Sequence, residues 1–202
     1  MPDELDTVAH FEKECGLPPG FYLSLLREDD WSFVIKLHAL VEATVSRLLA
    51  GTCMRPELLD TFSRLELSNS TTGKLAFAKA LGCLEEADRR FIRSLSEIRN
   101  DFVHDVRQAG KDLKAYTSGF DANQWNKFRL AFGPGRETID FGNVTMTELE
   151  FVRNNPKAAI WLSGIYVVAL AYLRKEEASL EARHAVLRLE AYNRLFRPSS
   201  GA

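Results

Sequence analysis

The sequence carries almost no net charge. It holds 26 Lys and Arg against 28 Asp and Glu, which gives a formal charge of −2 at pH 7. A chain with this balance has no global electrostatic attraction for nucleic acid, so an RNA or DNA site would have to be a local patch. The sequence also lacks a basic stripe interleaved with aromatic residues, and it lacks a helix-turn-helix pattern. Direct, sequence-specific DNA binding is therefore not expected.

Cysteine pairs and targeting segments are missing as well. Cys15, Cys53 and Cys83 are odd in number and show neither close pairing nor metal-ligand spacing. This pattern predicts that the cysteines are reduced, buried thiols of a cytosolic protein and that they do not form a disulfide. The first residues, M-P-D-E-L-D, are acidic and lack the continuous apolar segment of a signal peptide. We therefore expect a cytoplasmic protein with no metal and no cofactor.

The apolar runs are too short to predict a membrane span. Ala158 to Leu173 is apolar for sixteen residues, between Lys157 and Arg174. A helix needs roughly 20 such residues to cross a bilayer. This run therefore predicts a buried core helix and no membrane partner.

What the chain does have is the composition of a helical globular protein. Its residues are 46% hydrophobic and 27% charged, which is typical of soluble proteins, and 202 residues can build one sizeable core. Apolar side chains recur at helical spacing, which predicts an all-α fold. We predict a single all-helical domain with an N-terminal extension (1–28), a core (29–132) and C-terminal helices (145–197).

Local signals bound the expected helices. Asp29 or Asp30 can cap a first long helix that runs to Gly51. Asn155 followed by Pro156 is a helix start, and that helix can run to about Phe196, with a charged second half that projects along or beyond the core. The core bundle is expected from Trp31–Ala50, Glu85–Val103 and Pro156–Leu173. The other expected helices are 3–15, 21–26, 56–67, 74–84, 85–105, 113–120, 121–132 and one opened by Thr145 or Thr147, with residues 138–144 extended.

Residues 94–105, S-L-S-E-I-R-N-D-F-V-H-D, concentrate the polar groups that hint at chemistry. At about 100° per residue, one apolar stripe of this helix faces the core. Asn100 and His104 share a face turned away from that stripe, and Arg99 lies on its flank. We call the sector from Arg99 through Ser96 and Asn100 to His104 the polar wall. Because apolar Ile92 and Val103 are mixed into it, it predicts a two-fold homodimer contact. The core stripe consists of Phe91, Leu95, Ile98 and Phe102.

The six residues R-N-D-F-V-H resemble the R-N-x-x-x-H motif of the HEPN superfamily of helical domains. The preceding K-L-A-F-A-K-A-L-G-C-L and F-I-R-S-L-S-E-I-R-N-D-F-V-H are similar to the mannitol operon repressor branch of that superfamily. The resemblance covers Leu67 to Asp105 well and Trp31 to Ala50 loosely. It implies a HEPN-like helical bundle, here with a long C-terminal helix.

The resemblance implies a metal-independent endoribonuclease of toxin or defence type, because catalytic members of the superfamily cut RNA as dimers. His104 would be the acid/base, since histidine titrates near neutral pH. Arg99 would clamp the phosphate and stabilise the charge of the transition state, and Asn100 would orient them. Within one helix Arg99 and His104 lie about 140° apart. The geometry therefore favours either a composite site across a homodimer or no site.

A regulatory function stays open beside the enzyme. The mannitol operon repressor branch resembles a regulator that acts through protein partners, so the chain can be a non-catalytic interaction module. In that interpretation Arg99 pairs with a nearby carboxylate, Asn100 is an exposed polar residue and His104 caps a helix end. The enzyme would bind RNA and an antitoxin, whereas the regulator would bind a regulatory protein.

Other candidate sites are weaker. His38 and Glu42 are four residues apart on the first long helix but lack a third metal ligand, so His38 is interpreted as a core or interface residue. Glu42 can instead meet the helix of Arg99. T-T-G-K-L at 71–75 lacks the first glycine and the hydroxyl residue of a phosphate-binding loop. The stretch 89–114 has seven basic against four acidic residues that could steer a phosphate chain or form a solvated face: Arg89, Arg90, Arg93, Arg99, Arg107, Lys111 and Lys114, against Glu97, Asp101, Asp105 and Asp112.

Overall fold

The computed structural model describes residues 8–10, 12–104, 110, 112–140, 142 and 144–196. It is an all-α protein with a long C-terminal helix, which confirms the predicted fold class. Within the described residues the sheet is a single small hairpin, in which β1 (Thr138–Asp140) pairs antiparallel with β2 (Thr145–Thr147). The sequence predicted an extended piece at 138–144 but not its pairing with 145–147.

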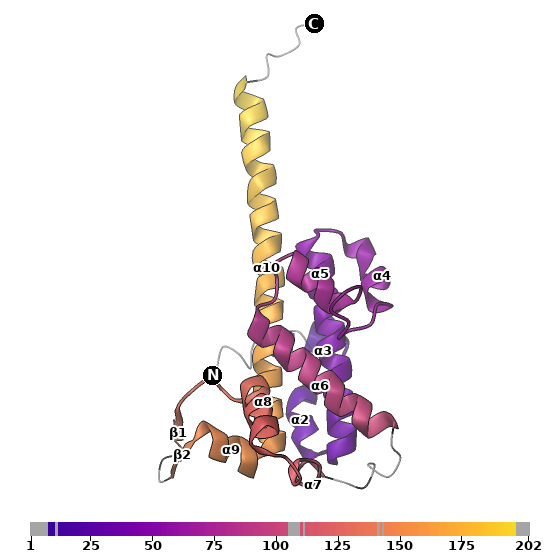
Figure 1. The fold of residues 1–202 in the computed structure, drawn as a ribbon. Coiled ribbons are helices and arrows are strands. Elements are labelled where there is room, and N and C mark those ends of the chain that lie inside the picture. The colour runs from indigo at the N-terminus through magenta and orange to yellow at the C-terminus, as the bar shows by residue number, and fades with distance from the viewer. Residues whose placement is uncertain are drawn as a thin grey trace, which may run out of the picture.

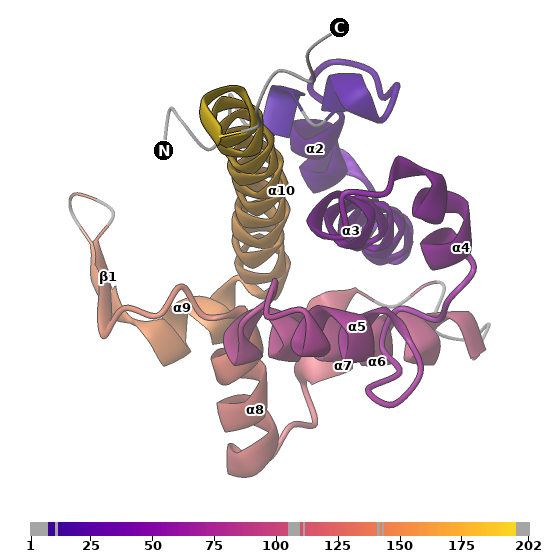
Figure 2. The same cartoon turned by 90° about the horizontal axis from the view of Figure 1, so that it is seen from above.

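Three long helices form the frame of the fold: α3 (Asp30–Thr52), α6 (Glu86–His104) and α10 (Pro156–Phe196). α3 and α10 run side by side, and α6 crosses them (Figure 1). The view from above shows α5 (Lys74–Ala80), α6 and α8 (Ala122–Phe132) gathered on one side of the α3–α10 pair (Figure 2). α3, α6 and α10 are the three helices that were predicted to form the core bundle.

The start of α3 follows from a side-chain cap. Asp29 has extended backbone, and its carboxylate accepts hydrogen bonds from the Ser32 N–H at 2.9 Å and from the Ser32 hydroxyl at 2.6 Å. These bonds lower the pKa of Asp29. The cap satisfies one of the N–H groups that a helix start leaves unpaired. The predicted start at Asp29 or Asp30 is confirmed.

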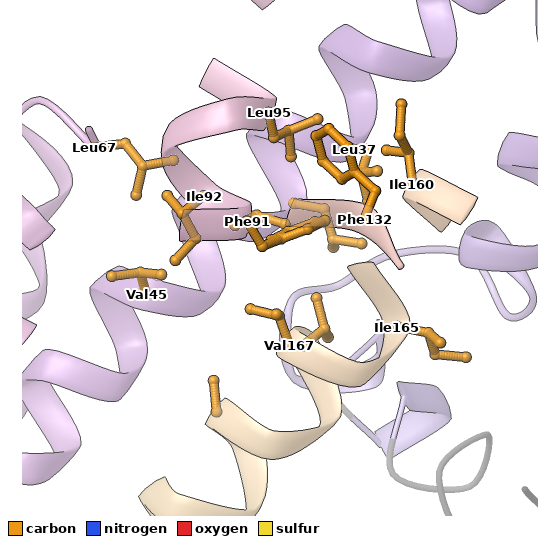
Figure 3. Packing of buried hydrophobic residues seen from close by; sticks show 14 of the residues in the cluster. Leu37, Val45, Leu67, Phe91, Ile92, Leu95, Phe132, Ile160, Ile165 and Val167 are labelled. Atoms are coloured by element: carbon orange, nitrogen blue, oxygen red, sulfur yellow. The ribbon is translucent and has the colours of Figure 1, made fainter. Parts of the chain in front are cut away.

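The core lies where α3, α6, α8 and α10 meet. The predicted apolar stripe of α6 is buried along its whole length, from Phe91 to Phe102. Phe91 and Phe132 meet edge to face with ring centroids 5.7 Å apart, an arrangement that aromatic pairs prefer. Figure 3 shows Phe91, Ile92 and Leu95 of α6 among core residues from α3 and α10. Each such side chain stabilises the fold by about 1.5–3 kcal/mol relative to an exposed one.

Shorter elements surround this core. α5 ends at Ala80 instead of the predicted 84, because Gly82 adopts φ +65° and the Cys83 N–H bonds back to the Ala78 carbonyl, a common helix ending. Residues 8–10 and 12–14 are helical and Cys15 lies in a turn, while residues 3–7 and 11 of the helix predicted at 3–15 lie outside the described residues. The remaining elements are α2 (Phe21–Ser24), η1 (Leu25–Arg27), η2 (Pro56–Leu58), α4 (Leu59–Ser63), α5 (Lys74–Ala80), α7 (Leu113–Thr117), α8 (Ala122–Phe132) and α9 (Glu148–Asn154).

α10 has two halves of different character. Its first half packs in the bundle, with Val167, Val168 and Ala171 buried. Its second half extends beyond the other helices, as predicted (Figure 1). By length and composition α10 could cross a membrane, but 44% of the apolar window is buried inside the fold.

Candidate functional site

The last two turns of α6 carry the three residues of the R-N-x-x-x-H motif. Arg99 is half-buried, whereas Asn100 and His104 are exposed. The Arg99 Nη1 donates a hydrogen bond of 3.0 Å to the Asn100 Oδ1. Among the described residues, no hydrogen bond joins the side chains of Arg99 and His104. One chain thus brings Arg99 and Asn100 together and leaves His104 one turn further along the helix.

Ile92 and Ser96 cannot take part in the predicted homodimer contact, because both are buried inside the chain. Ile92 is 0% exposed and Ser96 is 2% exposed, because α3 of the same chain packs on this side of α6. The Ser96 hydroxyl donates to the Ile92 carbonyl at 2.8 Å and lies 3.1 Å from the His38 Nε2. The apolar face of α6 is wider than the predicted stripe, as is usual for a helix that packs against more than one neighbour. The exposed part of the polar wall is reduced to Arg99, Asn100, Val103 and His104.

His38 stands in the α3–α6 interface beside this reduced wall. It is half-buried, and burial is the main cause that lowers its pKa. The carboxylate of Glu42 opposes this effect, and the positive charges of Arg99 and Lys74 add to it. His38 is therefore held in its neutral form at neutral pH. Because the Ser96 hydroxyl already donates to a carbonyl, the His38 Nε2 is assigned as the donor to Ser96.

A buried ion pair lies next to His38. The Lys74 Nζ is 2.5 Å from the Glu42 Oε1 and 3.4 Å from the Ser63 carbonyl, and the Lys74 side chain is 0% exposed. This lysine is therefore turned toward a carboxylate of its own chain, which agrees with the rejection of 71–75 as a phosphate loop. Glu42 contacts the start of α5, not the Arg99 helix as we had expected. Sequence spacing could not show this pairing, because the two residues are thirty-two positions apart.

Aromatic side chains hold the end of α6 in place. The Trp31 indole donates to the Phe102 carbonyl at 3.1 Å, and the Tyr116 hydroxyl donates to Asp101 at 2.7 Å. Burial, followed by the bond to Asp101, raises the pKa of Tyr116. Asp101 thus links α6 to α7 and is not the carboxylate that orients Arg99.

The basic stretch of residues 89–114 is partly neutralised by local pairs. Glu86 accepts from Arg89 at 2.9 Å and from Arg93 at 2.5 Å. The hydrogen bonds from Arg93 and Arg89 lower the pKa of Glu86. Arg107 and Lys111 lie outside the described residues. Of the described basic residues in this stretch, Arg99 is the one that belongs to the motif.

Among the described residues, no group of three or more His, Cys, Asp or Glu side chains could hold a metal ion. Cys83 is buried and Cys15 and Cys53 are half-buried, and all three are free thiols.

Comparisons of the chain with protein-family models, with curated proteins and with solved structures each found no match. The similarity to HEPN domains accordingly stays a prediction from the motif and from the preceding helix.

Proposed function

We propose that this chain is a HEPN-like, metal-independent endoribonuclease with a composite Arg/His site across a homodimer. The observation that supports the proposal is the end of α6, where the half-buried guanidinium of Arg99 is oriented by Asn100 and an exposed His104 follows one turn later on another side of the helix. A guanidinium in this position is ordered by its neighbour and still open to a phosphate. The toxin or defence role, with an antitoxin as partner, is part of the same proposal.

The residue types suit RNA cleavage without metal. A base removes the proton of the 2′-hydroxyl, whose oxygen attacks the adjacent phosphorus as the bond to the 5′-oxygen breaks and an acid protonates that oxygen. An imidazole near its pKa can take either part, so His104 is assigned as the acid/base. The guanidinium of Arg99 binds the charge that develops on the phosphoryl oxygens.

The composite arrangement follows from the helix geometry. Arg99 and His104 are five residues apart and project about 140° from each other around α6. A two-fold contact centred on the exposed Asn100 and Val103 faces would place His104 of one chain near Arg99 of the other. Because Ile92 and Ser96 are buried, this contact has to be smaller than the sequence predicted.

Cleavage assays test the proposal directly. Purified protein should cut single-stranded RNA in the presence of a chelator. His104→Ala should lower the rate 10²–10⁴-fold, as loss of an acid/base group typically does, and Arg99→Ala should have a comparable effect. His10→Ala is the matched control, because His10 is also an exposed histidine. Equal cleavage by wild type and His104→Ala would reject the assignment.

A second candidate function is supported by a different observation. The second half of α10 is exposed and carries large apolar side chains, among them Leu180 and Leu187, which suits a module that binds another protein. In this case the chain is a transcriptional regulator that acts through partners, similar to the mannitol operon repressor. If wild-type protein freed of any antitoxin cuts none of a varied set of RNA substrates, the regulator would be favoured over the endoribonuclease. Both functions belong in the cytoplasm, and the three free thiols support that location.

A further inference from the structure

The second half of α10, which we call the arm (residues 177–195), leaves the bundle and exposes apolar side chains (Figure 1). Leu180 is 56% exposed and Leu187 is 60% exposed. Four other exposed apolar side chains of the arm lie outside the seam described below: Val186, Leu189, Tyr192 and Leu195. Leucines at this exposure are unusual on an isolated helix in water, since burial of such side chains drives association. We therefore expect the arm to bind a partner surface that buries these leucines.

The sequence of the arm has the seven-residue period of a coiled coil. Leu173, Leu180 and Leu187 recur at intervals of seven, which is the repeat of one core position. The second core position of the same repeat holds Glu177, His184 and Ala191. The positions that flank this seam are charged: Arg174, Glu181 and Arg188 on one side, and Glu176, Arg183 and Glu190 on the other.

These flanking charges are incompatible with a parallel pair of arms. In a parallel coil, the residue directly before a position of the Glu177 set faces the residue whose number is five higher in the second helix. Glu176 would then meet Glu181 of a second copy, and Arg183 would meet Arg188 of that copy. Like charges at these positions repel and exclude the arrangement.

An antiparallel pair of arms brings opposite charges together. When the two-fold axis of the pair passes between Ala185 and Val186, Glu181 meets Arg188 of the second copy and Arg183 meets its Glu190. The two-fold axis repeats both pairs, so four attractive pairs line the seam. A shift by one heptad would instead place Glu181 against Glu181 and Arg183 against Arg183.

The core positions agree with the same register. Leu180 then packs on Ala191 of the second copy, and Leu187 packs on its His184. At each end Glu177 faces Arg194 of the second copy, which extends the charge pattern by another pair. The two arms overlap over residues 177–194, about 26 Å of helix at 1.5 Å per residue.

We infer that the arm binds the arm of a second copy of this chain as an antiparallel two-stranded coil, with its centre between Ala185 and Val186. The inference uses none of the residues at the end of α6 and stands independently of the proposed endoribonuclease. It assigns Leu180 and Leu187 to a second copy, in place of the different protein that the second candidate function assigns to them. The coil holds the two bundles at its opposite ends.

A charge-swap experiment on the full chain tests this inference. One variant combines Arg183→Glu with Arg188→Glu, and the other combines Glu181→Arg with Glu190→Arg. All four side chains are exposed, so helical content should stay as in wild type. Sedimentation at micromolar concentration should give a dimer for wild type, monomers for each variant alone and a dimer for their equimolar mixture.

The matched control places the same charge change off the arm. Arg27→Glu with Arg64→Glu alters two exposed residues that lie away from the arm, in η1 and just after α4, and should leave the dimer intact. A monomeric wild type would overturn the inference, and so would dimers that persist in both arm variants alone.

Cysteine cross-linking then reports the orientation. His184→Cys in one wild-type chain should form a disulfide with Leu187→Cys in a second, because these positions face each other in the antiparallel register. Leu187→Cys in both chains should give no disulfide above that of the native cysteines. The reverse pattern would show a parallel coil and overturn the inference.

Discussion

Replacing Glu42 by glutamine should destabilise the fold, because it leaves the ammonium of Lys74 buried without a charged partner. The Lys74 Nζ is 2.5 Å from the Glu42 carboxylate, and its side chain is 0% exposed against 35% for Glu42. Removing one partner of a fully buried pair typically costs about 3–5 kcal/mol. Water reaches the Glu42 side here, so we expect a loss of about 2–3 kcal/mol.

Urea unfolding followed by circular dichroism measures this loss as a shift in midpoint at constant slope. For a chain of this size the melting temperature should fall by about 4–12 °C. Glu57→Gln is the control, because Glu57 pairs with Arg55 at 3.4 Å while both side chains are more than half exposed. Such a surface pair contributes about 0–1 kcal/mol.

The double variant separates a lost charge from a lost contact. Glu42→Gln together with Lys74→Met removes both charges and should lie within about 1 kcal/mol of wild type, because an apolar side chain of similar volume suits the buried site. If Glu42→Gln and Glu57→Gln had equal effects, the buried pair would not stabilise the fold in the way argued here. A double variant that is less stable than Glu42→Gln alone would refute the charge argument as well.

Three further predictions follow from other contacts. Gly73→Ala should lower the free energy of unfolding by about 1–3 kcal/mol, because its Cβ would lie 2.4 Å from the Glu66 carbonyl. Gly119→Ala has open space around it and should leave that free energy unchanged, and urea unfolding measures both. Burial lowers the pKa of His38, so the unfolded chain takes up the proton first and stability should fall as the pH drops below about 6.5. The loss of stability between pH 7.5 and pH 5.5, measured by urea unfolding, should be smaller for His38→Asn than for wild type. Tyr116→Phe removes the hydrogen bond to Asp101 and should cost about 0.5–1.5 kcal/mol in the same unfolding assay.

The sequence predicted the framework because helix starts and apolar periods are local features. Asp29 caps α3, Asp121 caps α8 and Thr147 caps α9 by side-chain hydrogen bonds of the kind that short motifs reveal. The end of α5 was placed too late, since the left-handed conformation of Gly82 depends on the bond from Cys83 back to Ala78. That bond cannot be read from composition.

The exposure of the candidate residues was predicted in part, whereas their role stays a prediction. Exposure of Asn100 and His104 followed from the helical period, and so did the flank position of Arg99. The burial of Ile92 and Ser96 did not, because it depends on where α3 crosses α6. The link from His38 to Ser96 spans fifty-eight positions, and no local pattern specifies a contact at that separation. Long-range pairing of polar residues thus set the limit of the sequence argument.

The arm and the end of α6 are separate surfaces, and their spatial relation constrains both proposals. An antiparallel coil of about 26 Å keeps the two bundles apart, so the arm pair cannot bring His104 of one chain to Arg99 of the other. A composite site therefore needs a second, independent two-fold contact at Asn100 and Val103. The α6 contact is small, because Ile92 and Ser96 are buried, so at micromolar concentration only the arm pair should persist without RNA. The variant with Arg183→Glu and Arg188→Glu should accordingly sediment as a monomer and still cut RNA, with its α6 faces meeting on the substrate. Loss of cleavage in that variant, with helical content unchanged, would mean that the arm completes the site and that the antiparallel register is wrong.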